Sequence, residues 1–149
     1  MVGGQGERKT MRIGAERADM VNLTAPIAEI PRKLEALAGH CERAGRDIGD
    51  INKTALNSLI TGATMDAAAA KRDTLLTTRG MPRWDDLDEG TQQMIGARFL
   101  VGGPDEIGEQ VQHLLGLGLD GVTVNMPADG HDPEAVAFAG QVLDKALRQ

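Results

Sequence analysis

Residues 99–126 read FLVGGPDEIGEQVQHLLGLGLDGVTVNM and contain an apolar run, a helical stretch and a second apolar run. The helix has a clear start, because Pro104 suits the first helical position and the two acids after it favour the positive end of a helix. Gly116 and Gly118 end the helix, and residues 122–126 then form the clearest strand in the chain. This order predicts a parallel α/β sheet.

The same alternation extends along the chain in both directions. Upstream we expect, in order, a helix over 7–18, a strand over 19–23, a helix over 27–44 and a strand over 51–60. Residues of about 61–96 are less regular and are expected to be an insertion in which 65–78 is helical. Downstream, Asp132 and Pro133 start a last helix. Its expected buried stripe is Val136, Ala139, Leu143 and Leu147.

Composition narrows the classes of function. A length of 149 residues with an apolar fraction of 41% suits one globular domain, and a net charge of −6 argues against a nucleic-acid or membrane-surface partner. The sequence holds no apolar run long enough to span a membrane and no secretory leader, so we expect a cytoplasmic protein. The single Cys41 cannot form an internal disulfide.

The glycine-rich segment Gly3-Gly4-Gln5-Gly6 runs directly into the first expected helix. Glycines allow backbone N–H groups to approach an anion, and a helix N-terminus carries partial positive charge, so the segment suits phosphate. Arg8 and Lys9 add cations that a bound anion would balance. The alternative is a solvated N-terminal tail. Only Met1 and Val2 precede the glycines, so we expect no complete strand before them, although residues 1–4 fit the cut end of one.

Two asparagines stand where expected strands end. Asn22 and Asn125 fall at carboxyl ends, which is where parallel α/β proteins bind ligands. Asparagine also closes turns, and that alternative stays open. His131 is interpreted as a loop residue and the acidic stretch 85–89 as solvated. No residue spacing suits a metal, and no catalytic residue is assigned.

Four stretches in order resemble the luciferase-like monooxygenase family, and most closely its branch of coenzyme F420 (deazaflavin)-dependent oxidoreductases. The first is Gly3-Gly4-Gln5-Gly6-Glu7-Arg8-Lys9-Thr10, followed by Ala18-Asp19 and Asn22. The others are residues 31–47, 101–107 and 117–122. Each motif is only moderately specific, and the four together cover nearly the whole chain.

The resemblance implies a (β/α)₈ barrel, which needs about 250 residues. Residues 1–149 are therefore expected to form one partial barrel domain, the C-terminal half, interrupted by the insertion at about 61–96. The implied function is an oxidoreductase that transfers a hydride with coenzyme F420, or alternatively FMN. The candidate cofactor-binding residues are Gly3, Gly4, Gly6, Arg8, Asn22 and Asn125.

The expected partners follow from the family resemblance and from the half-barrel that it implies. The family acts on small-molecule substrates, and a half-barrel leaves unpaired strand edges that favour a homo-oligomer or association with a missing N-terminal half. The chain alone is then expected to be weakly active or inactive, as a truncated domain. The alternative is a non-catalytic α/β binding or assembly module derived from the barrel. A small phosphate-ligand enzyme that uses His131 has only the glycine segment to support it.

Overall fold

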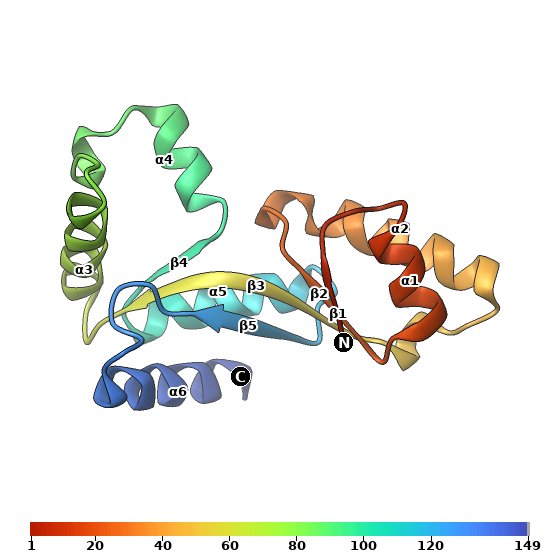
Figure 1. Ribbon diagram of the computed structural model, residues 1–149. Coiled ribbons are helices and arrows are strands. Elements are labelled where there is room, and N and C mark those ends of the chain that lie inside the picture. Colours follow the sequence, from red (N-terminus) through yellow and green to blue (C-terminus); the bar gives the residue numbers. More distant parts are fainter. Residues whose placement is uncertain (149) are drawn as a thin grey trace. The chain divides into compact units, whose positions relative to one another are not determined.

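Strand β3 (Asn52–Thr61) carries most of the strand pairing in the computed structural model, which describes residues 1–148. β2 (Met20–Leu23) pairs in parallel with its N-terminal half, and β4 (Phe99–Gly102) pairs in parallel with its C-terminal half (Figure 1). β1 (Val2–Gly4) pairs in parallel with β2, and β5 (Gly121–Asn125) pairs with β3.

Helices alternate with these strands. The α-helices are α1 (Thr10–Arg17), α2 (Ile30–Ala44), α3 (Met65–Thr78), α4 (Glu89–Gly96), α5 (Pro104–Gly116) and α6 (Pro133–Leu147). Short 3₁₀ turns are η1 (Ile27–Glu29), η2 (Ile48–Asp50) and η3 (Trp84–Asp86). The chain divides into two compact units. Unit 1 comprises Met1–Leu56 with Leu114–Thr123, and unit 2 comprises Asn57–His113 with the residues from Val124 onward.

The core of unit 1 lies between β2 and the helix pair α1 and α2. Met11 and Ala15 of α1, Val21 of β2 and Leu37 of α2 are fully buried. Because Val21 lies against Gly14 of α1, the next residue along β2 directs its side chain to the opposite face of the sheet. That residue is Asn22, a predicted site residue.

Unit 2 buries Leu59 of β3 and Leu100 of β4 together with apolar residues of α5, including Ile107 and Val111. Gln110 of α5 completes the hydrogen bonding of β4. Its side-chain oxygen accepts from the Val101 N–H at 3.2 Å, and its amide nitrogen donates to the Val101 carbonyl at 3.0 Å. These are the groups that a neighbouring strand would use, so Gln110 occupies this position of the strand edge.

Several expected elements are confirmed with their boundaries close to prediction. The strands over 19–23 and 51–60 correspond to β2 and β3, and the helix over 65–78 corresponds to α3. α2 ends at Ala44 and is capped by Gly45, whose φ of 65° is left-handed and therefore favours glycine. The insertion also contains α4, which was not predicted; its start is marked by Asp88, whose side chain accepts from the Thr91 N–H at 3.0 Å.

We expected at most the cut end of a strand before the loop, and the structure has a short paired strand there that includes two of the glycines. Val2, Gly3 and Gly4 form β1, in register with Val21, Asn22 and Leu23. The first helix also begins three residues later than expected, at Thr10. Glycines carry no side-chain pattern, so a three-residue strand that contains two of them forms only because β2 offers it a pairing partner.

The expected buried stripe of the last helix is also wrong in part. Val136 and Leu147 are 46% and 47% exposed, whereas Val142 and Ala146 are buried beside Ala139. The stripe that packs is therefore displaced around the helix. Val136 instead lines a shallow apolar groove with Val124 and other residues of unit 2.

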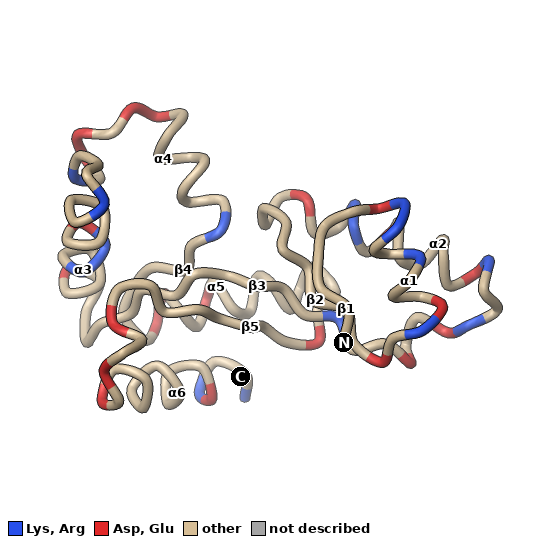
Figure 2. The backbone as a smooth tube through the Cα atoms, viewed as in Figure 1, with Lys and Arg blue, Asp and Glu red and all other residues tan. Residues whose placement is uncertain are grey.

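Charged residues of both signs are interspersed along the helices, as Figure 2 shows for α1 and α2. Within residues 1–148, no helix combines the length and the apolar character that crossing a membrane requires.

One buried polar side chain of unit 2 lacks hydrogen bonds. Asn57 of β3 is 1% exposed, and neither its amide nitrogen nor its amide oxygen has a partner among residues 1–148. A buried polar group without a partner costs about 1–3 kcal/mol, so Asn57→Leu, which has a similar volume, is expected to stabilise the chain by about 1 kcal/mol or more. Urea unfolding followed by circular dichroism measures this gain. A loss of stability would contradict the prediction and indicate an internal water bound to Asn57.

Candidate functional site

The glycine segment leaves the sheet at the carboxyl ends of two parallel strands. β1 ends at Gly4 and β2 at Leu23, and these two residues are paired in register. The Thr24 N–H continues this pairing by donating to the Gly4 carbonyl at 3.4 Å. Ligands of parallel α/β proteins bind beyond this edge of the sheet, so the loop over residues 5–9 starts at the place where a ligand is expected.

The loop folds back against the first residue of α1. A Cβ atom added at Gly4 would lie 3.1 Å from Thr10 Cγ2, and one added at Gly6 would lie 3.0 Å from Thr10 Oγ1. Gly4 also has a φ of 146°, which side chains rarely adopt. The two glycines therefore allow the loop to pack closely against Thr10, and Gly6 remains exposed.

The N-terminus of α1 is positively charged. Lys9 stands at the N-cap, the first turn carries no acid, and no side chain of residues 1–148 caps this helix end by a hydrogen bond. Arg8, Lys9 and Arg12 are exposed around it. The helix dipole and these three cations act in the same direction, so the loop provides the charge and the backbone exposure that a phosphate needs.

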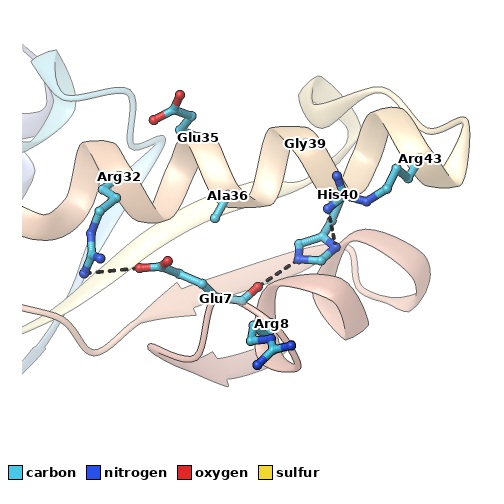
Figure 3. Close-up of a pocket in the computed structure, with 8 residues that line it drawn as sticks. All are labelled: Glu7, Arg8, Arg32, Glu35, Ala36, Gly39, His40 and Arg43. Atoms are coloured by element: carbon cyan, nitrogen blue, oxygen red, sulfur yellow. Dashed lines mark hydrogen bonds and ion pairs between the residues drawn. The ribbon is translucent and has the colours of Figure 1, made fainter.

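Glu7 holds this loop on α2. Its carboxylate accepts from Lys33 Nζ at 2.8 Å and lies 3.2 Å from Arg32 Nη2, as Figure 3 shows for the arginine. The hydrogen bond from Lys33 lowers the pKa of Glu7, and the hydrogen bond to Glu7 raises the pKa of Lys33. Lys33 is buried, and its charge is balanced by this carboxylate and by that of Glu29 at 3.2 Å.

His40 contacts the backbone of Glu7. Its Nε2 lies 2.8 Å from the Glu7 carbonyl, and its Nδ1 lies 2.9 Å from Arg43 Nη2 (Figure 3). A carbonyl only accepts and a guanidinium only donates, so Nε2 carries the hydrogen and the ring is neutral in this arrangement. A shallow groove of about 590 Å³ runs along these contacts between the loop and α2.

We expect the contact of Glu7 with Lys33 to make stability depend on pH. A carboxyl whose pKa is lowered by folding stabilises the fold above its ordinary pKa of about 4.3, and this contribution is lost as pH falls through the lowered value. Glu7→Gln should therefore lower the melting temperature at pH 7, and the difference from the parent protein should shrink towards pH 3. Thermal unfolding between pH 3 and pH 7 measures this.

The matched control for that series is Glu35→Gln. This variant removes an exposed carboxylate of α2, the helix that Glu7 contacts. It should leave the melting temperature close to that of the parent protein at every pH. A loss that is the same size at pH 3 and at pH 7 for Glu7→Gln would contradict the electrostatic explanation.

Asn22 lies in a buried polar cluster of unit 1. Its side-chain oxygen accepts from the Thr54 hydroxyl at 3.1 Å, and the Thr123 hydroxyl lies 2.9 Å away. Asn22 is 9% exposed. The three residues come from β2, β3 and β5, so this cluster joins neighbouring strands through their side chains. In this arrangement the Asn22 oxygen is already used within the protein.

The predicted site residues are thus divided between the two units. Gly3, Gly4, Gly6 and Arg8 lie in β1 and the loop that follows it, and Asn22 is paired with Gly3 through the strand register. Asn125, the exposed last residue of β5, belongs to unit 2. The roles of all six residues in cofactor binding stay predictions.

Other sequence candidates have local roles. Asp132 accepts from the Glu134 N–H at 2.9 Å and so caps α6, while His131 is exposed. The hydrogen bond from the Thr91 hydroxyl lowers the pKa of Asp88, which caps α4. In the described part of the chain, no group of three or more His, Cys, Asp or Glu residues is placed to hold a metal ion. The contacts of Glu7 with α2 were missed, because they join residues 26 and 33 positions apart and leave no local pattern.

Residues 1–121 match the sequence model of the luciferase-like monooxygenase family. The chain belongs to this family. The expected fold class is confirmed: the parallel strands and helices of this luciferase-like chain correspond to about half of a (β/α)₈ barrel. No curated protein sequence matches the chain.

Solved structures of similar fold include enzymes of several activities. The coenzyme F420-dependent tetrahydromethanopterin reductase from Methanopyrus kandleri is 20% identical, with a TM-score of 0.71 over 97% of this chain and 50% of that chain. A long-chain alkane monooxygenase is 16% identical, with a TM-score of 0.73 over 98% of this chain and 40% of that one.

The oxygenating constituent of 3,6-diketocamphane monooxygenase from Pseudomonas putida was solved with FMN. It is 19% identical, with a TM-score of 0.61 over 95% of this chain and 45% of that chain. The luciferase-like chain thus spans half or less of the length of each of these proteins.

Proposed function

We propose that this luciferase-like chain binds the phosphate-bearing part of a deazaflavin or flavin cofactor through residues 3–9. The observation that carries the proposal is the loop between β1 and α1, where the exposed Gly6 lies beside a cation-rich helix end that no side chain of the described residues caps. Two similar structures support the cofactor class, since one is named as F420-dependent and another was solved with FMN. We propose coenzyme F420 as the cofactor, with FMN as the alternative.

The bound cofactor would supply a carbon or nitrogen centre that takes up or releases a hydride. The protein's own residues contribute position and charge. Gly4 and Gly6 would admit the phosphate to the backbone, and Arg8 and Lys9 would balance its charge. Glu7 would keep the loop in place through Lys33 and His40. In this proposal the chain acts in an oxidoreductase on a small-molecule substrate.

We propose that these 149 residues alone turn over substrate weakly or not at all. The resemblance implies that the reactive ring of the cofactor is held by the N-terminal half of the barrel, and the chain covers about half the length of its structural relatives. Binding of the cofactor is therefore a more direct test than turnover.

The test is a titration of the purified chain with coenzyme F420 and, separately, with FMN, followed by cofactor fluorescence. Saturable binding that weakens with inorganic phosphate and with added salt supports the proposal, because the loop recognises the phosphate largely by charge. Failure of both cofactors to bind, alone and in the presence of the N-terminal half of a relative, would overturn it.

A second candidate function is that of an assembly module. β1 pairs only with β2 in the described part of the chain, so its other edge is free, and the exposed Val136 lies in an apolar groove beside β5. Free edges and apolar grooves favour association with another chain. Native mass spectrometry that shows a stable oligomer, together with no affinity for either cofactor, would favour this function over the first.

A further inference from the structure

Two strands of the chain have a free edge. In β3, the N–H groups of Asn52 and Ser58 donate to carbonyls just before β2 and β4. The Lys53 carbonyl accepts from the Asp120 N–H, just before β5. Alternate residues of a strand bond towards opposite edges, so β2 and β4 share one edge of β3 and β5 takes the other. Among the described residues, β5 therefore has no neighbour beyond β3, and β1 has none beyond β2.

The edge formed by β5 and α6 is apolar but incompletely covered. β5 corresponds to the clearest strand in the sequence, yet none of its residues is buried. On α6, two members of the apolar stripe that the sequence predicts, Val136 and Leu147, are 46% and 47% exposed. Val136 and Leu143 line a groove of about 370 Å³ with Val124 of β5. A surface that has the pattern of a buried face and lies open in one chain indicates a partner.

The edge formed by β1 and α1 is complementary to it. Val2 is paired with Val21 and therefore points to the helix-covered face of the sheet, where it is half-buried. Ile13 of α1 is 44% exposed. Residues 8–17 carry four cations and one acid, whereas residues 127–147, which include α6, carry four acids and one cation. The two edges thus have opposite net charges of +3 and −3, and both expose apolar groups.

We propose that a second copy of this chain covers these edges, with β1 and α1 of each copy docked on β5 and α6 of the other. β1 pairs with the free edge of β5, and Val2 enters the groove beside Val136. Each copy carries one edge of each kind, so the same contact is made twice and a dimer leaves neither edge unpaired. Two copies together have about the length of a structural relative, of which one chain covers 50%.

The experiment measures the mass of the purified chain by sedimentation equilibrium from micromolar to submillimolar concentrations. We expect a dimer whose dissociation constant rises with added salt, because the two edges attract each other by opposite charges. A chain that stays monomeric over this range overturns the inference, and so does one that associates only with the N-terminal half of a relative. Assemblies larger than a dimer also overturn it, because the contact would then not close on two copies.

Variants locate the contact. Val136→Lys adds a charge to the stripe of α6, and Ile13→Glu adds an acid opposite the acidic segment of the second copy. Each should raise the dissociation constant of the dimer about tenfold or more. Both side chains are exposed in one chain, so both variants should fold, and circular dichroism checks this. An unchanged dissociation constant in both folded variants would contradict the proposed contact.

The matched controls are Met94→Lys and Met94→Glu. Met94 lies on α4, outside both edges, and is 69% exposed. These two variants add the same charges to an exposed apolar position and should leave the dissociation constant of the dimer unchanged. A loss of association as large as that of Val136→Lys and Ile13→Glu would show a general effect of charge and would overturn the assignment of the edges.

Hydrogen exchange separates this contact from one between two α6 helices. In the proposed dimer, the free N–H groups of both β1 and β5 become hydrogen-bonded. They should therefore exchange more slowly in the parent chain than in Val136→Lys at the same concentration. Protection of α6 without protection of β1 would overturn the proposed pairing.

The outcome is separable from that of the proposed function. The contact between copies requires no cofactor, and it gives the alternative function, that of an assembly module, a surface and a partner. A dimer that binds neither coenzyme F420 nor FMN would overturn the cofactor proposal alone. Cofactor binding by a chain that stays monomeric would overturn the present inference alone.

Discussion

Gly14→Ala is expected to destabilise the chain by about 1–3 kcal/mol, although alanine normally stabilises a helix relative to glycine. A Cβ atom at this position of α1 would lie 2.6 Å from Val21 Cγ2, and Leu37 Cδ1 would be 3.7 Å away. Val21 is fully buried and branched at Cβ, so it cannot turn aside without disturbing the core. Urea unfolding followed by circular dichroism measures the loss.

Gly140→Ala is the matched control, since Gly140 also lies within a helix, α6. No heavy atom among the described residues lies within 4 Å of a Cβ added there. This variant should gain up to about 1 kcal/mol from helix propensity. The opposite signs separate packing from propensity.

A double-mutant cycle identifies the clash. Val21→Ala makes room beside α1, so Gly14→Ala should cost less in that background than in the parent protein. A Gly14→Ala variant as stable as the parent chain would show that α1 does not pack on β2 as closely as the structure indicates.

Gly6→Asp is expected to weaken cofactor binding about tenfold relative to Gly6→Asn. Both side chains have the same shape and meet Thr10 in the same way, so the comparison isolates one negative charge beside the proposed phosphate. Two like charges several ångströms apart near a protein surface repel by about 1–3 kcal/mol, and this corresponds to a tenfold loss or more. Fluorescence titration with coenzyme F420 or FMN measures the ratio.

Salt provides an internal check on that comparison. The difference between the two variants should shrink at 1 M salt, because the Debye length then falls to about 3 Å. Equal affinities of Gly6→Asp and Gly6→Asn at low salt would contradict a phosphate site in the loop, and the proposed function would then lose its main support.

Local sequence determined most of the secondary structure. Pro104 and Asp132 mark helix starts, Gly45 marks a helix end, and the apolar run over 122–126 marks a strand; the structure has the corresponding elements. These signals depend on the backbone preferences of single residues and on apolar periodicity, so they act over a few positions and can be recognised without the fold. Their alternation was sufficient to predict the α/β class.

Part of the candidate site could be predicted in the same way. The glycines and the cations of residues 3–9 are adjacent in sequence, so their chemistry was visible before their geometry. What could not be predicted is how the loop is held. Glu7 meets Lys33 and His40 only because α1 and α2 pack together, and no periodic pattern encodes a contact of this kind.

The sequence by itself thus determined which elements form and where the phosphate-type loop lies. Tertiary structure alone decided that Val2–Gly4 is a strand, that Val136 stays exposed, and that Lys71 meets Asp129 across 58 residues. The physical reason is that strand pairing, burial and ion pairing depend on which surfaces approach one another. Local preferences set the shape of each element, and only the packed chain sets its neighbours.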